Sequence, residues 1–107
     1  IVGKWSLNKH ILNGVQKPTH NGLELIFNQD IIICNSRSWN QLWPVRVQYE
    51  TIKGATSGYF YRGDGCIFEV KSINGEELVL DLIQKNTSTQ ELKTHQFHFK
   101  RIDENVS

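Results

Sequence analysis

The chain has 107 residues, of which 38% are hydrophobic and 21% are charged, and its formal net charge is +1. These values suit one soluble globular domain spanning 1–107 and exclude disordered and membrane classes of protein. A charge so close to neutral gives no electrostatic reason to expect nucleic acid or an anionic membrane as a partner. Since no apolar run approaches the length of a transmembrane helix, we predict no membrane-spanning segment.

The start of the chain and its two cysteines bear on the cellular location of the protein. The chain begins at Ile1 and contains no methionine. We therefore expect a mature, exported protein, periplasmic, cell-surface or secreted, whose precursor could carry a lipid anchor. Cys34 and Cys66 both lie in or beside apolar stretches. Either buried free thiols or a disulfide fits these positions, and the spacing matches no metal or redox motif.

Alternation of apolar and polar residues dominates the chain and predicts short β-strands separated by turns. About eight such blocks occur, at 2–7, 23–28, 31–34, 45–50, 59–61, 66–73, 78–83 and 96–100. Asn74-Gly75 gives the clearest hairpin signal, because a type I′ turn needs positive φ at both central residues. No segment has helical periodicity, and the stretches 8–21 and 36–44 are predicted to be irregular.

Consecutive antiparallel strands with short connections indicate an all-β fold. We predict an up-and-down meander barrel of about eight strands with no C-terminal helix, because closure of the sheet removes its exposed edges. A two-sheet sandwich is the alternative that the pattern leaves open. A barrel as narrow as this one is expected to fill mainly with its own side chains.

The first and last strands carry a recognisable pair of features. The first strand contains Gly3-Lys4-Trp5, a G-x-W sequence, and the last strand ends at Arg101. Arg101 lies on the same face as Phe97 and Phe99, which should point inward. In a closed barrel the two strands are neighbours, so Arg101 could stack on Trp5 as a cation–π pair. With its meander and its aromatic-basic finish, the chain resembles lipocalin-like (calycin) domains, especially those of short bacterial surface lipoproteins and barrel-type protease inhibitors.

This resemblance implies a function in binding rather than in catalysis. Gly3, Trp5 and Arg101 would be structural signature residues that close one end of the barrel. The barrel would bind a small apolar ligand or a protein partner at its rim and loops. The alternative is an inhibitor of a secreted protease that acts through its loops or its N-terminal segment. No cofactor is implied.

Aromatic residues supply the candidate binding site. The stretch 36–44 holds two tryptophans, a leucine and an arginine, which either plug the mouth of the barrel or anchor a ligand or partner. Tyr59 and Tyr61 flank Phe60, so aromatic rings occupy both faces of that strand. The predicted ligand- or partner-binding residues are Arg37, Trp39, Leu42, Trp43, Tyr49, Tyr59 and Tyr61. The predicted lining of the barrel is Leu25, Phe27, Val47, Tyr49 and Leu80.

Residues of the types that bind metals or catalyse reactions form no recognisable motif in this sequence. His95 and His98 are three apart on a strand and face opposite sides, while His10 and His20 lie in a predicted loop, so we expect no metal site. Arg62-Gly63-Asp64 fits a tight turn. The sequence contains no nucleophile motif, phosphate loop or zinc-protease motif, so we predict no enzyme and no catalytic residue.

Overall fold

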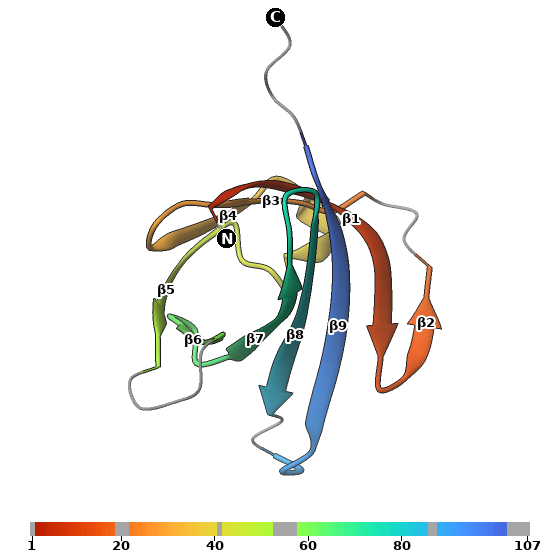
Figure 1. The fold of residues 1–107 in the computed structure, drawn as a ribbon. Coiled ribbons are helices and arrows are strands. Elements are labelled where there is room, and N and C mark those ends of the chain that lie inside the picture. The colour runs from red at the N-terminus through yellow and green to blue at the C-terminus, as the bar shows by residue number, and fades with distance from the viewer. Residues whose placement is uncertain (1, 19–21, 41, 53–57, 86–87, 103–107) are drawn as a thin grey trace, which may run out of the picture.

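In a computed structural model, the chain wraps into an antiparallel β-barrel (Figure 1). The structure describes residues 2–18, 22–40, 42–52, 58–85 and 88–102. In those segments the strands are β1 (Gly3–Leu12), β2 (Val15–Lys17), β3 (Glu24–Phe27), β4 (Ile31–Cys34), β5 (Arg46–Thr51), β6 (Tyr59–Arg62), β7 (Ile67–Ile73), β8 (Glu77–Lys85) and β9 (Leu92–Arg101). One short 3₁₀ turn, η1 (Arg37–Trp39), lies between β4 and β5.

The sheet is a meander that closes on itself. Its strand order is β2-β1-β3-β4-β5-β6-β7-β8-β9, and β1 also pairs with β9. Strands β1 and β3 to β9 therefore form a closed eight-stranded barrel, and β2 lies outside it against β1 (Figure 1). Closure confirms the predicted barrel and excludes the sandwich. Among the described residues there is no α-helix, and none of their helical turns could cross a membrane.

The prediction that 8–21 is irregular was wrong for residues 8–17, whereas residues 19–21, which include His20, lie outside the described residues. Strand β1 continues to Leu12 and turns at Asn13-Gly14 into β2. Asn13 has a φ of 48° and Gly14 a φ of 85°, the pair of positive values that a type I′ turn requires. Asn74-Gly75 also joins two strands, but neither residue has positive φ. The predicted type I′ geometry was therefore wrong for this hairpin, in which the Asn74 side-chain oxygen accepts hydrogen bonds from the backbone N–H groups of Glu76 and Glu77.

Alternation along the strands fills the barrel with apolar side chains. The fully buried residues are Trp5, Leu23, Leu25, Phe27, Ile32, Trp43, Phe68, Leu78, Leu80, Leu82, Phe97 and Phe99. Burial of each aliphatic or phenylalanine side chain stabilises the fold by about 1.5–3 kcal/mol. Four of the five residues predicted to line the barrel are thus parts of a packed core, and Val47 packs against it; the four are Leu25, Phe27, Tyr49 and Leu80.

Strand β1 contains a bulge that changes which residues face inward. The pairing between β1 and β9 shifts register between Leu7 and Lys9, where Asn8 is exposed. Before the bulge Trp5 is buried, and after it His10 is buried. An extra residue in one strand reverses the parity of all residues beyond it, so His10 points into the barrel.

The end of the barrel that carries Trp5 is closed by Arg101. The Arg101 guanidinium carbon lies 4.4 Å from the centroid of the Trp5 ring. Arg101 Nε also donates a hydrogen bond to the Gly75 carbonyl at 2.9 Å, and Nη1 to the Val2 carbonyl at 3.4 Å. A Cβ at Gly3 would collide with the guanidinium, so the glycine lets Arg101 lie against the backbone. We call this end the closed end and the opposite end the mouth.

Replacement of Arg101 tests the role of the closed end. Arg101→Ala removes the cation–π contact and both hydrogen bonds, and should lower the free energy of unfolding by about 1–2 kcal/mol. Urea denaturation measures this change. Arg46→Ala, on the exposed side of β5, is the control and should change stability by less than about 0.5 kcal/mol. Equal effects of the two variants would contradict a structural role for Arg101.

Candidate functional site

The segment between β4 and β5 folds over the mouth of the barrel. In η1 the Trp39 backbone N–H donates to the Ser36 carbonyl at 3.0 Å, and Trp43 N–H donates to the Trp39 carbonyl at 2.8 Å. The Asn40 side-chain amide donates to the Trp43 carbonyl at 3.0 Å. These bonds turn the backbone back on itself and direct Trp43 into the barrel. We call residues 36–44, of which Gln41 is outside the described residues, the mouth loop.

Four of the predicted binding residues meet in the mouth loop. Trp43 is fully buried, with its ring centroid 5.4 Å from that of Phe97 and 6.4 Å from that of Phe99. Trp39 and Leu42 are half-buried and pack against the core, and Arg37 is exposed. The mouth loop is therefore a plug with one tryptophan inside and a half-exposed apolar rim.

The three predicted tyrosines do not join this loop. Tyr49 is inside the barrel, and its hydroxyl donates to the Asn28 carbonyl in the turn between β3 and β4. Tyr59 and Tyr61 lie on the outer side of β6, where Tyr61 is 47% exposed. A surface pocket of about 320 Å³ involves Tyr61, and its lining residues are Asp30, Gln48, Tyr49, Glu50, Tyr61, Arg62 and Gly63. The predicted seven residues thus divide among the mouth, the interior and the outer face.

An ion pair at the mouth between the buried Arg62 and the partly exposed Asp64 was missed by the sequence analysis, which treated Arg62-Gly63-Asp64 only as a turn. Arg62 is 3% exposed, and its Nε and Nη2 donate to the two Asp64 carboxylate oxygens at 2.7 and 2.6 Å. Its guanidinium carbon lies 5.1 Å from the Trp43 ring centroid. Burial would raise the pKa of Asp64, but the hydrogen bonds and charge of Arg62 outweigh it and hold that pKa below its usual range.

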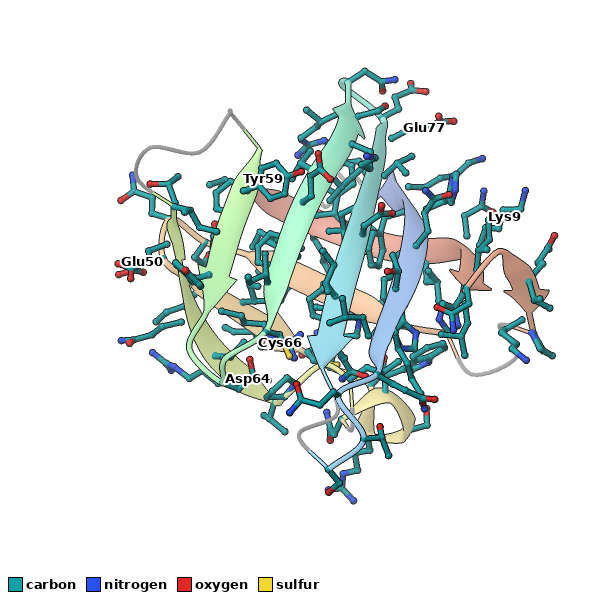
Figure 2. The ribbon with its side chains drawn as sticks, turned by 90° about the horizontal axis from the view of Figure 1, so that it is seen from below. Lys9, Glu50, Tyr59, Asp64, Cys66 and Glu77 are labelled. Atoms are coloured by element: carbon teal, nitrogen blue, oxygen red, sulfur yellow. The ribbon has the colours of Figure 1, made fainter. Side chains whose placement is uncertain are left out.

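The two thiols lie near the same end of the barrel. Figure 2 shows Asp64 and Cys66 together at the end where η1 lies, and Glu77 at the opposite end. Cys66 accepts a hydrogen bond from Arg62 Nη2 at 3.4 Å, and Cys34 donates to the Ser36 carbonyl at 3.5 Å. Both cysteines are free, and burial raises the pKa of each thiol. Both thiols are therefore neutral at physiological pH.

A second polar pair lies beneath Trp39. His10 Nε2 and His95 Nδ1 are 3.0 Å apart, and the two side chains are 6% and 5% exposed. Burial lowers the pKa of His95 to about 4, with His10 and Lys93 acting in the same direction. Burial and then Lys17 lower the pKa of His10. The two imidazoles are therefore neutral at pH 7 and share one hydrogen bond. The placement of His10 in a loop was wrong, because it lies on β1.

Three buried polar atoms near the mouth have no hydrogen-bond partner among the described residues. They are Trp43 Nε1, Arg62 Nη1 and His95 Nε2. An unsatisfied buried donor costs about 1–3 kcal/mol, so such atoms in a native fold need an explanation. No group of three possible metal ligands occurs in the described part of the chain.

Comparison with known proteins bears on the fold. No family model matches the sequence, and no curated protein matches it. A solved structure of bovine odorant-binding protein, a deswapped triple mutant, matches with a TM-score of 0.57 and 15% sequence identity. The match covers 98% of this chain and 75% of that chain. This chain has a lipocalin-like fold. At 15% identity the likeness concerns the fold alone, and function must be argued from the site.

The buried histidines of this lipocalin-like barrel predict a dependence of stability on pH. Their pKa values lie below the unfolded value of 6.5, so the unfolded chain binds protons first as the pH falls. The contribution of the two neutral histidines to the free energy of unfolding should be fully present above pH 6.5 and should be lost as the pH falls toward 4. For His95 this loss should be about 3 kcal/mol. Urea denaturation at pH 7.5, 6, 5 and 4.5 measures this decrease.

Two variants identify the source of the pH effect. His10→Leu/His95→Leu replaces both partners with apolar groups of similar size and should flatten the pH profile between 7.5 and 4.5. His98→Gln changes an outward-facing histidine of β9 and should leave the profile unchanged. A profile that stays steep in the double variant would assign the effect to other groups.

The ion pair at the mouth predicts a non-additive pair of substitutions. Asp64→Asn leaves the Arg62 charge buried without its partner and should cost about 2 kcal/mol of stability. Arg62→Met/Asp64→Asn removes both charges and should cost less than Asp64→Asn alone. Thermal denaturation of the three variants, with Arg62→Met as the third, completes the cycle. Additive effects would mean that the two side chains do not stabilise each other.

Proposed function

We propose that this chain is a non-enzymatic binding protein that holds a small, mainly apolar ligand at the mouth of its barrel. The observation that carries the proposal is the mouth loop, whose aromatic side chains separate a packed apolar interior from a half-exposed apolar rim. The lipocalin-like fold supports it, because the bovine protein of similar fold is an odorant-binding protein by name.

The packing of the interior limits where a ligand can lie. Phe27, Phe68 and the rest of the core are fully buried against one another, so the ligand does not sit deep in the barrel. It enters under the mouth loop and rests between Trp39, Trp43 and the Phe97 ring. Trp39 is 6.2 Å and Trp43 is 5.4 Å from Phe97, centroid to centroid, so a small lift of the loop separates these rings.

Printed hydrogen bonds fix the start of the mouth loop to the barrel: Ser36 Oγ donates to the Gly22 carbonyl at 2.7 Å and accepts from the Glu24 N–H at 3.2 Å. The Asn40 amide also reaches Cys34 Sγ at 3.7 Å. The bonds from Trp43 to Trp39 and from Asn40 to Trp43 lie within the loop, so they can move with it when the part after Ser36 lifts about this anchor. Contacts with a ligand would then replace the aromatic contacts that the loop gives up. The resulting affinity is set by the difference between these two sets of contacts.

A neutral fluorescent probe tests the proposal. N-phenyl-1-naphthylamine should bind with a rise in its fluorescence, and Trp39→Ala should weaken binding roughly fivefold or more by removing an aromatic anchor. Tyr61→Ala, on the outer side of β6, is the matched control and should leave the affinity unchanged. Both variants are first checked by thermal denaturation.

Two results would oppose the proposal. Equal losses in Trp39→Ala and Tyr61→Ala would place the probe away from the mouth. Absence of probe binding, together with loss of activity of a secreted protease on addition of the chain, would favour the alternative function of protease inhibitor.

A further inference from the structure

Two neighbouring hydrogen-bond donors are buried at the mouth without an acceptor in the described part of the chain. They are the indole Nε1 of Trp43, which is fully buried, and Nη1 of Arg62, which is 3% exposed. The two side chains are in contact, since the guanidinium carbon is 5.1 Å from the Trp43 ring centroid. Because an oxygen acceptor has two lone pairs, one oxygen placed where these two side chains meet can accept from both donors.

The geometry of Arg62 explains why Nη1 is left over. A guanidinium is planar and presents its donors in a rigid fork. Nε and Nη2 occupy one edge of the guanidinium, and both donate hydrogen bonds to the Asp64 carboxylate. The turn that returns Asp64 to Arg62 depends on Gly65, whose φ of 94° strains any other residue. Nη1 lies on the far side of the guanidinium from this carboxylate.

The charges at the mouth decide which kind of acceptor fits. The positive charge of Arg62 is neutralised by Asp64, and the buried His10 and His95 are neutral. In the buried part of the mouth an anionic group would therefore meet no unpaired cation, since Arg37 of the mouth loop is exposed, and its desolvation cost would be large. An uncharged oxygen accepts the same hydrogen bonds without that cost, and the surrounding rings of Phe97 and Trp39 suit an apolar body.

We propose that the ligand carries an uncharged oxygen acceptor, such as a ketone, ester or amide carbonyl, which binds Arg62 Nη1 and Trp43 Nε1. This inference rests on the proposed function and adds the chemical class of the ligand. The rest of the molecule is apolar and contacts the aromatic rings of the mouth. Specificity comes from the two donors, because a ligand that lacks the oxygen leaves both of them unsatisfied.

Three probes of matched shape test this inference. They are 2-acetylnaphthalene, which has a ketone, 2-isopropylnaphthalene, which has no acceptor, and 2-naphthoate, which is charged. Equilibrium dialysis at pH 7.5 measures the affinity of the full chain for each. We expect the ketone to bind about tenfold more tightly than either of the others, the effect of about 1.4 kcal/mol from the added hydrogen bonds.

Two variants assign the preference to the two donors. Trp43→Phe removes the indole N–H and keeps an aromatic ring, and should reduce the ketone preference severalfold. Arg62→Met/Asp64→Asn removes the guanidinium without leaving an unpaired carboxylate, and should abolish the preference while binding of 2-isopropylnaphthalene persists. Arg46→Met, exposed on β5, should leave all three affinities unchanged. Thermal denaturation confirms that each variant is folded at the temperature of the dialysis.

The possible outcomes separate this inference from the proposed function. Equal binding of the three probes overturns the carbonyl site and leaves binding at the mouth intact. Tightest binding of 2-naphthoate overturns it in favour of an anion site. A ketone preference that survives in both variants overturns the assignment to Trp43 and Arg62. Failure of all three probes to bind removes the proposed function and this inference with it.

Discussion

Pairing between β1 and β9 is the interaction on which the rest of the molecule depends. It runs from Trp5 opposite Arg101 at the closed end to Leu12 opposite His95 at the mouth. By joining the first barrel strand to the last, it removes two sheet edges that would otherwise be open to other chains. It also builds both ends at once, because it sets Arg101 over Trp5 and brings His10 to His95 across the whole length of the sequence. Closure of the barrel, the closed end and the histidine pair of the mouth are consequences of one register.

That register includes the bulge at Asn8, and the bulge explains why the histidine pair of the mouth could not be predicted from the sequence. Strict alternation from Trp5 would turn residue 10 outward. The extra residue reverses the parity, so His10 enters the barrel and meets His95. No local signal marks this bulge, since Asn8 is neither a glycine nor part of a turn. The site therefore depends on a long-range pairing that only the folded sheet reveals.

Other features differ in how far the sequence predicts them, for physical reasons. Barrel strands follow from alternation, and the Trp5–Arg101 contact could be expected from parity and closure because it needs no knowledge of loops. The composition of the mouth loop indicated a plug or an anchor, but the entry of Trp43 rather than Trp39 depends on hydrogen bonds such as that from the Asn40 side-chain amide to the Trp43 carbonyl. Burial of Arg62 could not be predicted from the sequence, because an arginine beside a glycine-rich turn is ordinarily a surface residue.

Beneath the exposed rim, the mouth combines apolar packing with buried polar groups that are neutral or paired with an opposite charge. The ion pair cancels the charge of Arg62, and burial keeps the imidazoles and thiols uncharged. In such surroundings water screens little, so a single hydrogen bond is stronger than it would be on the surface, and an unmatched charge is far less tolerable. The same burial makes the unsatisfied N–H groups of Trp43 and Arg62 a cost to the free fold. The free energy of unfolding of a fold of this size is small. A ligand that accepts hydrogen bonds from these N–H groups would remove their cost, and its binding would therefore raise the free energy of unfolding.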